Sequence, residues 1–178
     1  MNNFQEDLNF SNSASEEKFW HEIYKKAFPN IQGYIQCRDN GQGQKLGIDR
    51  IIYLTNGSIL RIDEKKRRES WNDILIEYGN LYKKDNSFLN DGWINKDLLI
   101  DYLAYAFLPL KRVYLLDWLI LKKVWQTNKM IWYNKATNKE SGFVLVSAEN
   151  ENYTTWSIAV PIETLLKELN NSRTIQLS

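Results

Sequence analysis

Cysteine, net charge and long apolar runs are all scarce in this chain of 178 residues. Its one cysteine, Cys37, can form neither an intrachain disulfide nor a cysteine-built zinc site, and a lone thiol suits a reducing compartment. No apolar run reaches the roughly 18 residues that span a bilayer, and the polar N-terminus does not have the pattern of a signal peptide. The net charge of +1 gives no overall field for a polyanion. We therefore expect a soluble, cytoplasmic protein with no membrane partner.

Core-forming residues, by contrast, are plentiful. Hydrophobic residues make up 43% of the chain and aromatic residues 13%, which is far more than a disordered segment contains. The length fits one domain better than two. We expect a single domain over residues 1–178, in which about residues 1–12 form a loose Asn-rich arm.

The N-terminal third predicts a helix, a short strand and a loop. Residues 13–16 have the spacing of a capping box, and apolar residues then recur at helical spacing until Pro29. Residues 33–38 predict a strand, and the composition of 39–44 predicts a mobile loop.

The central segment predicts a β-hairpin and a third strand. Apolar runs at 46–54 and 58–67 flank Asn56-Gly57, the strongest short-range hairpin signal. Residues 74–78 predict the third strand, and 79–91 a polar loop.

The C-terminal half mixes both kinds of element. Periodicity allows helix or strand at 98–108; we favour a strand, because Tyr and Phe are frequent there and the strand-like 113–116 follows. We then expect a helix from Asp117 through Trp125, a hairpin at 143–147 and 153–160, and a last helix from Pro161. The fold class predicted is mixed α/β.

Carboxylates and a lysine stand at the ends of the hairpin strands. Asp49 begins the first strand, and Asp63-Glu64-Lys65 ends the second. Two facing carboxylates can hold a magnesium ion that keeps several waters, and a lysine on the same face can meet phosphate charge or position water. This set predicts metal-dependent hydrolysis of a phosphodiester.

The register of the hairpin decides which acid faces Asp49. If the two strands are counted equally outward from the turn, the residue numbers of two paired residues add to about 113, which places Asp49 opposite Glu64. A bulge or a slip of one would place it opposite Asp63. We prefer the pair Asp63 and Lys65, whereas the counting favours Glu64 and Lys66, so both registers remain open.

Cations cluster next to these acids. Lys65-Lys66-Arg67-Arg68 follows the second strand, with Arg50 and Arg61 nearby. Such a cluster would suit a passing phosphate backbone, and a solvated basic loop explains it almost as well.

These motifs resemble those of the PD-(D/E)XK nuclease superfamily, which has the restriction-endonuclease-like fold. The resemblance covers about residues 15–125. Its later part is similar to a branch of the superfamily from phages and mobile elements, and it is carried by Glu77, Gly92-Trp93-Ile94, Asp101-Tyr102 and Val113-Tyr114-Leu115-Leu116. It implies a mixed central sheet flanked by helices and Mg²⁺ or Mn²⁺ as cofactor. It also implies DNA as the partner, which the protein would cleave as an endonuclease or an exonuclease. Whether the protein forms a homodimer is left open by the resemblance.

The resemblance also assigns roles. Asp49, Asp63 and Lys65 would be catalytic, with Glu64 and Glu77 as further metal ligands. Nucleic acid would be bound by a group of cations: Arg50, Arg61, Lys66, Arg67 and Arg68. Two alternatives remain: a catalytically silent member of the fold that binds DNA or protein, and an unrelated α/β domain that binds a protein partner, should 98–108 be helical.

Overall fold

The computed structural model describes residues 14–37, 46–170 and 173–176. The chain is a mixed α/β protein, as predicted. It divides into two compact units. The mixed-sheet unit combines Asn2–Ser70, Leu98–Trp118 and Ser172–Ser178, and the antiparallel-sheet unit combines Trp71–Asp97 and Leu119–Asn171. The expectation of a single domain stays a prediction, and the expected arm at 1–12, the capping box at 13–16 in part, and the loop at 39–44 lie outside the described residues.

Six strands form the sheet of the first unit, in the order β1-β2-β3-β6-β7-β10. All neighbouring strands are antiparallel except β3 and β6, which run parallel. The strand prediction for 98–108 is confirmed by β6, and β10 was not predicted. The strands are β1 (Ile31–Gln36), β2 (Arg50–Leu54), β3 (Ile59–Arg67), β6 (Tyr102–Phe107), β7 (Arg112–Asp117) and β10 (Arg173–Gln176), with a 3₁₀ turn η2 (Leu108–Leu110) between β6 and β7.

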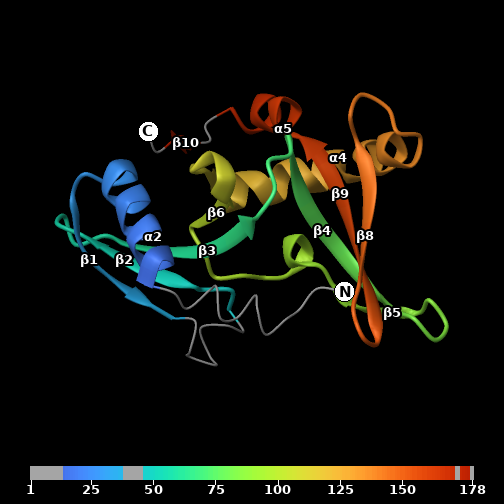
Figure 1. The fold of residues 1–178 in the computed structure, drawn as a ribbon, viewed down its shortest axis with the longest axis horizontal. Coiled ribbons are helices and arrows are strands. Elements are labelled where there is room, and N and C mark those ends of the chain that lie inside the picture. Colours follow the sequence, from blue (N-terminus) through green and yellow to red (C-terminus); the bar gives the residue numbers. More distant parts are fainter. Residues whose placement is uncertain (1–13, 38–45, 171–172, 177–178) are drawn as a thin grey trace. The chain divides into compact units, whose positions relative to one another are not determined.

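Helix α2 (Ala14–Ala27) covers one face of this sheet (Figure 1). It ends just before Pro29, as the sequence predicts, because proline cannot continue the helical hydrogen bonding. Trp20, Ile23 and Tyr24 on the helix are fully buried, and they share a core with strand residues Ile52 and Ile62. Because side chains alternate along a strand, this core fixes which strand residues face α2.

The hairpin is confirmed, but its predicted counting is wrong by one. In the pairing of β2 with β3, Arg50 lies opposite Ile62 and Tyr53 lies opposite Ile59. The residue numbers of paired residues therefore add to 112 instead of 113. The reason is a three-residue loop: the Leu54 amide donates to the carbonyl of Ser58 at 2.9 Å, and Gly57 adopts φ +82°. One extra loop residue moves every β2 residue by one position along β3.

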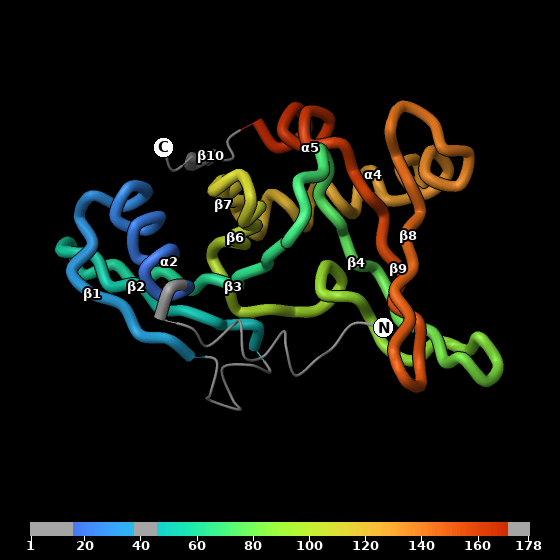
Figure 2. Tube along the Cα trace, in the orientation of Figure 1, coloured from blue at the N-terminus to red at the C-terminus, as the bar shows by residue number. Residues whose placement is uncertain are grey.

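The antiparallel-sheet unit has the strand order β5-β4-β9-β8. Its hairpins β4–β5 and β8–β9 lie side by side through the β4–β9 pairing (Figure 2). Residues 79–91, predicted as polar loop, in fact end β4 and form β5. The elements are β4 (Asp73–Tyr82), β5 (Phe88–Asp91), η1 (Trp93–Asn95), β8 (Val144–Glu149), β9 (Tyr153–Pro161), and the helices α4 (Trp118–Thr137) and α5 (Ile162–Leu169).

Helix α4 runs twelve residues beyond the predicted end at Trp125, since it contains no glycine or proline. Its buried Trp132 contacts Trp125 and Phe143, with ring centroids 6.3 and 6.1 Å apart. The late hairpin and the last helix are confirmed by β8, β9 and α5. No helix within the described residues is both long and apolar enough to cross a bilayer.

Candidate active site

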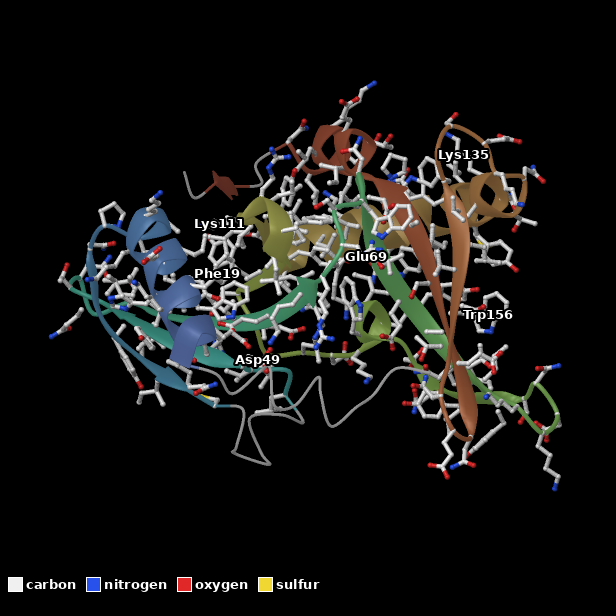
Figure 3. The ribbon with its side chains drawn as sticks, viewed as in Figure 1. Phe19, Asp49, Glu69, Lys111, Lys135 and Trp156 are labelled. Atoms are coloured by element: carbon white, nitrogen blue, oxygen red, sulfur yellow. The ribbon has the colours of Figure 1, made fainter. Side chains whose placement is uncertain are left out.

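Asp49 stands just before β2 (Figure 3). It bonds to β3 on either side of Asp63. Its backbone N–H donates to the carbonyl of Ile62 at 2.9 Å. Its carboxylate oxygen Oδ2 accepts a hydrogen bond from the backbone N–H of Glu64 at 2.8 Å. The side chain therefore takes the place of a backbone partner where the β2–β3 pairing ends, and it holds the carboxylate next to Asp63.

Asp63 and Lys65 point to the same side of β3 and form an ion pair. The Lys65 ammonium donates to Asp63 Oδ1 at 2.6 Å, and the side chain of Asp63 is only 4% exposed. The second oxygen, Asp63 Oδ2, is buried and has no hydrogen-bond partner among the described residues. A buried carboxylate oxygen without a donor is costly, so this atom marks a place suited to a proton or a cation.

The electrostatics of Asp49 indicate the same place. Burial raises the pKa of Asp49 to about 6, and the negative charge of Asp63 adds to that rise. The Lys65 charge and the Glu64 amide oppose it without cancelling it. Two ionised carboxylates can only accept hydrogen bonds. They are stable side by side when a proton or a cation lies between them.

Glu64 and Lys66 point to the other face, toward α2. Glu64 Oε1 accepts hydrogen bonds from Tyr24 at 2.8 Å and from Arg50 Nε at 2.7 Å. Lys66 donates to Glu16 at 2.6 Å. The register question is thus answered in favour of Asp63 and Lys65 beside Asp49, and Glu64, which we expected as a further metal ligand, does not face this pair.

Arg50 is fully buried, which leaves no surface for the predicted phosphate contact. Its guanidinium forms a bidentate pair with Glu17, at 2.8 and 3.1 Å, in addition to the bond with Glu64. It also stacks over the ring of Tyr34, 4.8 Å from the centroid. No local pattern of residues signals this network, because its members lie far apart along the chain.

The other predicted nucleic-acid contacts are partly engaged within the protein. Arg61, 43% exposed, pairs with Asp101 at 3.1 Å, and Asp101 also accepts the Arg61 amide at 2.7 Å. Arg67 is half-buried on β3 and Arg68 is exposed just beyond it. Of the predicted cations, Arg61, Arg67 and Arg68 therefore have accessible surface, and Lys66 has little.

Glu77, the other predicted metal ligand, belongs to β4 of the antiparallel-sheet unit. There its carboxylate accepts a hydrogen bond from Asn80 at 3.4 Å. Asn80 is part of a polar network in that sheet, which also includes Asn90 and Thr155. We do not count Glu77 in the candidate site.

The acid pair fits a metal that needs few protein ligands. Among the described residues, no group of three or more His, Cys, Asp and Glu side chains could hold a metal ion. Magnesium is commonly bound through only one or two carboxylates, with water and substrate phosphate completing its octahedron. The buried, partnerless Asp63 Oδ2 beside Asp49 fits such a binding mode.

No family model, no curated protein and no solved structure matches this chain. The fold and the site thus define the protein only by its architecture: a mixed α/β protein with a paired carboxylate and lysine cluster at the end of a β-hairpin.

Proposed function

We propose that this protein is a magnesium- or manganese-dependent nuclease that hydrolyses DNA phosphodiester bonds. Asp49 and Asp63 would hold the metal, and Lys65 would meet the phosphate or orient the attacking water. The resemblance to the PD-(D/E)XK superfamily, which rests on these same residues, agrees with this assignment.

One observation carries the proposal: among the described residues no donor reaches the buried Asp63 Oδ2, and the carboxylate of Asp49 lies within hydrogen-bond reach of Asp63. A structural ion pair would satisfy both oxygens, whereas here the Lys65 ammonium donates to Oδ1. A bound divalent cation supplies the missing positive charge and, as a Lewis acid, stabilises charge on a phosphate oxygen.

The residues of the chain divide the remaining work. The Glu64 amide fixes the Asp49 carboxylate, so that Asp49 can bind a metal without losing side-chain entropy. Lys65, 35% exposed, carries a charge that reaches solvent from the edge of the acid pair. Arg61, Arg67 and Arg68, from β3 and just beyond it, would hold the sugar–phosphate backbone.

Cleavage assays with purified variants test the proposal. Wild-type protein should nick or degrade DNA in the presence of Mg²⁺ or Mn²⁺. Asp63→Ala and Lys65→Ala should abolish cleavage while keeping the circular-dichroism spectrum and a cooperative melt. The exposed Asp91, changed to asparagine, is the matched control and should cleave normally. Unchanged cleavage by both site variants would contradict the proposal.

A catalytically silent DNA- or protein-binding module is the second candidate. The observation in its favour is that Lys65 is already paired with Asp63, and that within the described residues the site contains no group of three or more possible metal ligands. This candidate predicts no metal-dependent rise in melting temperature and no cleavage of any nucleic acid.

A further inference from the structure

The apolar pattern of the β2–β3 hairpin does not fix its register. Every residue of 51–54 is apolar, so β2 could turn either of its faces toward α2. The end of β3, Asp63-Glu64-Lys65-Lys66, gives an acid-x-Lys motif in either phase. Strands of this kind are prone to slip, and a slip of one residue turns every side chain to the opposite face.

The turn sequence favours a register that the structure does not have. Asn56-Gly57 is the preferred pair for a two-residue loop, which would make positions sum to 113. Asp49 would then lie opposite Glu64, and Arg50 opposite Asp63. The observed three-residue loop and the sum of 112 show that another interaction outweighs the turn preference.

Arg50 is the residue whose contacts exist only in the observed register. Its fully buried guanidinium reaches Glu17 on α2 and Glu64 on β3 at the same time. Tyr24 adds a second bond to the same Glu64 oxygen at 2.8 Å. Shifting β2 by one residue would turn Arg50 away from α2 and leave Glu64 buried without its cation.

We propose that Arg50 is a positioning residue that sets the β2–β3 register, and thereby brings Asp49 to Asp63 and Lys65. Arg50 directly follows Asp49, and Glu64 lies between Asp63 and Lys65. Fixing residues 50 and 64 toward α2 therefore directs Asp63 and Lys65 to the other face. The consequence for metal binding rests on the proposed function; the structural role does not.

A buried ion pair adds little net stability over uncharged residues of similar size, and in some proteins buried polar groups specify register instead. Replacing the pair by uncharged residues should therefore change the register without unfolding the protein. The variant Arg50→Met/Glu64→Gln removes both charges and keeps an amide oxygen that can accept from Tyr24. We expect its melting temperature to stay within about 5 °C of the wild type.

Two cysteine pairs report the register, each in a Cys37→Ser background. Tyr53→Cys/Ile59→Cys joins residues that lie directly opposite in the observed register. Tyr53→Cys/Leu60→Cys joins residues that would lie opposite if positions summed to 113. Directly opposite residues have Cα separations of about 4.5 to 5.5 Å, which suits a disulfide. The yields of the two disulfides after mild oxidation measure the two registers.

With Arg50 and Glu64 present, we expect at least about ten times more of the Tyr53–Ile59 disulfide than of the Tyr53–Leu60 disulfide, a ratio equivalent to 1.4 kcal/mol. In Arg50→Met/Glu64→Gln the two yields should become comparable, and the Mn²⁺-induced rise in melting temperature should disappear. Arg50→Lys, which keeps a cation near Glu64, should retain the original ratio.

An unchanged disulfide ratio in a folded Arg50→Met/Glu64→Gln variant overturns the proposal. If that variant does not fold, Arg50→Gln, which can still donate a hydrogen bond but brings no charge to Glu17 or Glu64, is scored with the same reporters. An unchanged ratio together with an unchanged Mn²⁺ response there also overturns it. If the wild type shows no Mn²⁺ response, the proposed function fails, whereas the disulfide ratio still decides the role of Arg50.

Discussion

The carboxylate of Asp49 accepts the backbone N–H of Glu64 at 2.8 Å, in a position that a strand carbonyl would otherwise occupy. This bond fixes one acid against the strand that carries the other, and both acids are largely buried. Burial, together with repulsion by the negative charge of Asp63, raises the pKa of Asp49 to about 6. The pair is therefore a local instability that a proton relieves at low pH, and that a cation would relieve at neutral pH.

Asp49→Asn should stabilise the protein at neutral pH in the absence of metal. The amide oxygen of asparagine can still accept the Glu64 N–H, and its NH₂ group can donate toward Asp63 Oδ2. A pKa of about 6, against an unfolded value of about 4, corresponds to roughly 2 to 3 kcal/mol. We expect a gain of about 2 kcal/mol in the free energy of unfolding at pH 7.5, measured by urea denaturation.

The sign of the pH dependence follows from the raised pKa. Between about pH 4 and pH 6 the native state binds more protons at Asp49 than the unfolded state does. The stability contributed by Asp49 is therefore complete below pH 4 and is lost as the pH rises through 6. The advantage of Asp49→Asn should vanish near pH 4. An asparagine variant less stable than wild type at both pH values would contradict this account.

Mn²⁺ should raise the melting temperature of the wild type, and the rise should depend on pH. Binding to the folded state alone adds about 2.7 kcal/mol at a hundred times the dissociation constant, or roughly 5 to 10 °C for a chain of this size. Because the metal needs ionised Asp49, its affinity should fall as the pH drops below about 6.

Asp63→Asn is the control for that titration and should remove the rise at pH 7.5. A rise that persists in Asp63→Asn, or that is the same at pH 5 and pH 7.5, would place the ion elsewhere on the protein. Differential scanning fluorimetry on the two proteins measures both outcomes.

Gly92→Ala should severely destabilise the antiparallel-sheet unit. A Cβ at this position would lie 2.2 Å from the carbonyl oxygen of Glu77 and 2.6 Å from the backbone nitrogen of Tyr78. Backbone atoms cannot move aside as a side chain can, so we expect a loss of more than about 3 kcal/mol. The matched control is Gly33→Ala, where a Cβ meets nothing within 4 Å and should cost about 1 kcal/mol or less. Equal urea midpoints for the two variants would disprove the close contact.

Tyr24→Phe should cost about 1 to 2 kcal/mol, because the hydroxyl donates to the buried, charged Glu64 at 2.8 Å. Burial and the neighbouring Glu64 charge raise the pKa of Tyr24, so that the hydroxyl stays protonated as a donor. Tyr82→Phe, at an exposed position, is the control and should be near neutral. A Tyr24→Phe variant as stable as the control would show that Arg50 alone satisfies Glu64.

Local patterns in the sequence predicted the local elements well. The first helix ends before Pro29, the hairpin forms around Asn56-Gly57, and 98–108 contains a strand, each for a reason that can be stated from neighbouring residues. The predicted grouping of Asp49, Asp63 and Lys65 also corresponds to residues that lie together. These features depend on spacing within about fifteen residues.

What the sequence did not predict depends on distant partners. The buried Arg50 pairs with Glu17, which is thirty-three residues away along the chain. The end of β4 pairs with β9, more than seventy residues later. The polar residues at the end of β4 were predicted as a loop because this distant partner is not visible in the local sequence. The burial of Asp63 Oδ2, which no donor reaches among the described residues, is a property of packing that no residue pattern reports.

The course of the chain through its two units limits how the site can be isolated. The chain leaves the mixed-sheet unit after Ser70 and re-enters it at Leu98. A fragment ending at Ser70 would hold Asp49, Asp63 and Lys65 and yet lack β6, whose backbone pairs with β3 at all three of the positions 63, 64 and 65. During synthesis, β3 must wait for residues 71–101 before it gains this neighbour. A continuous fragment that ends before β6 therefore leaves β3 without this neighbour along the residues that carry Asp63 and Lys65.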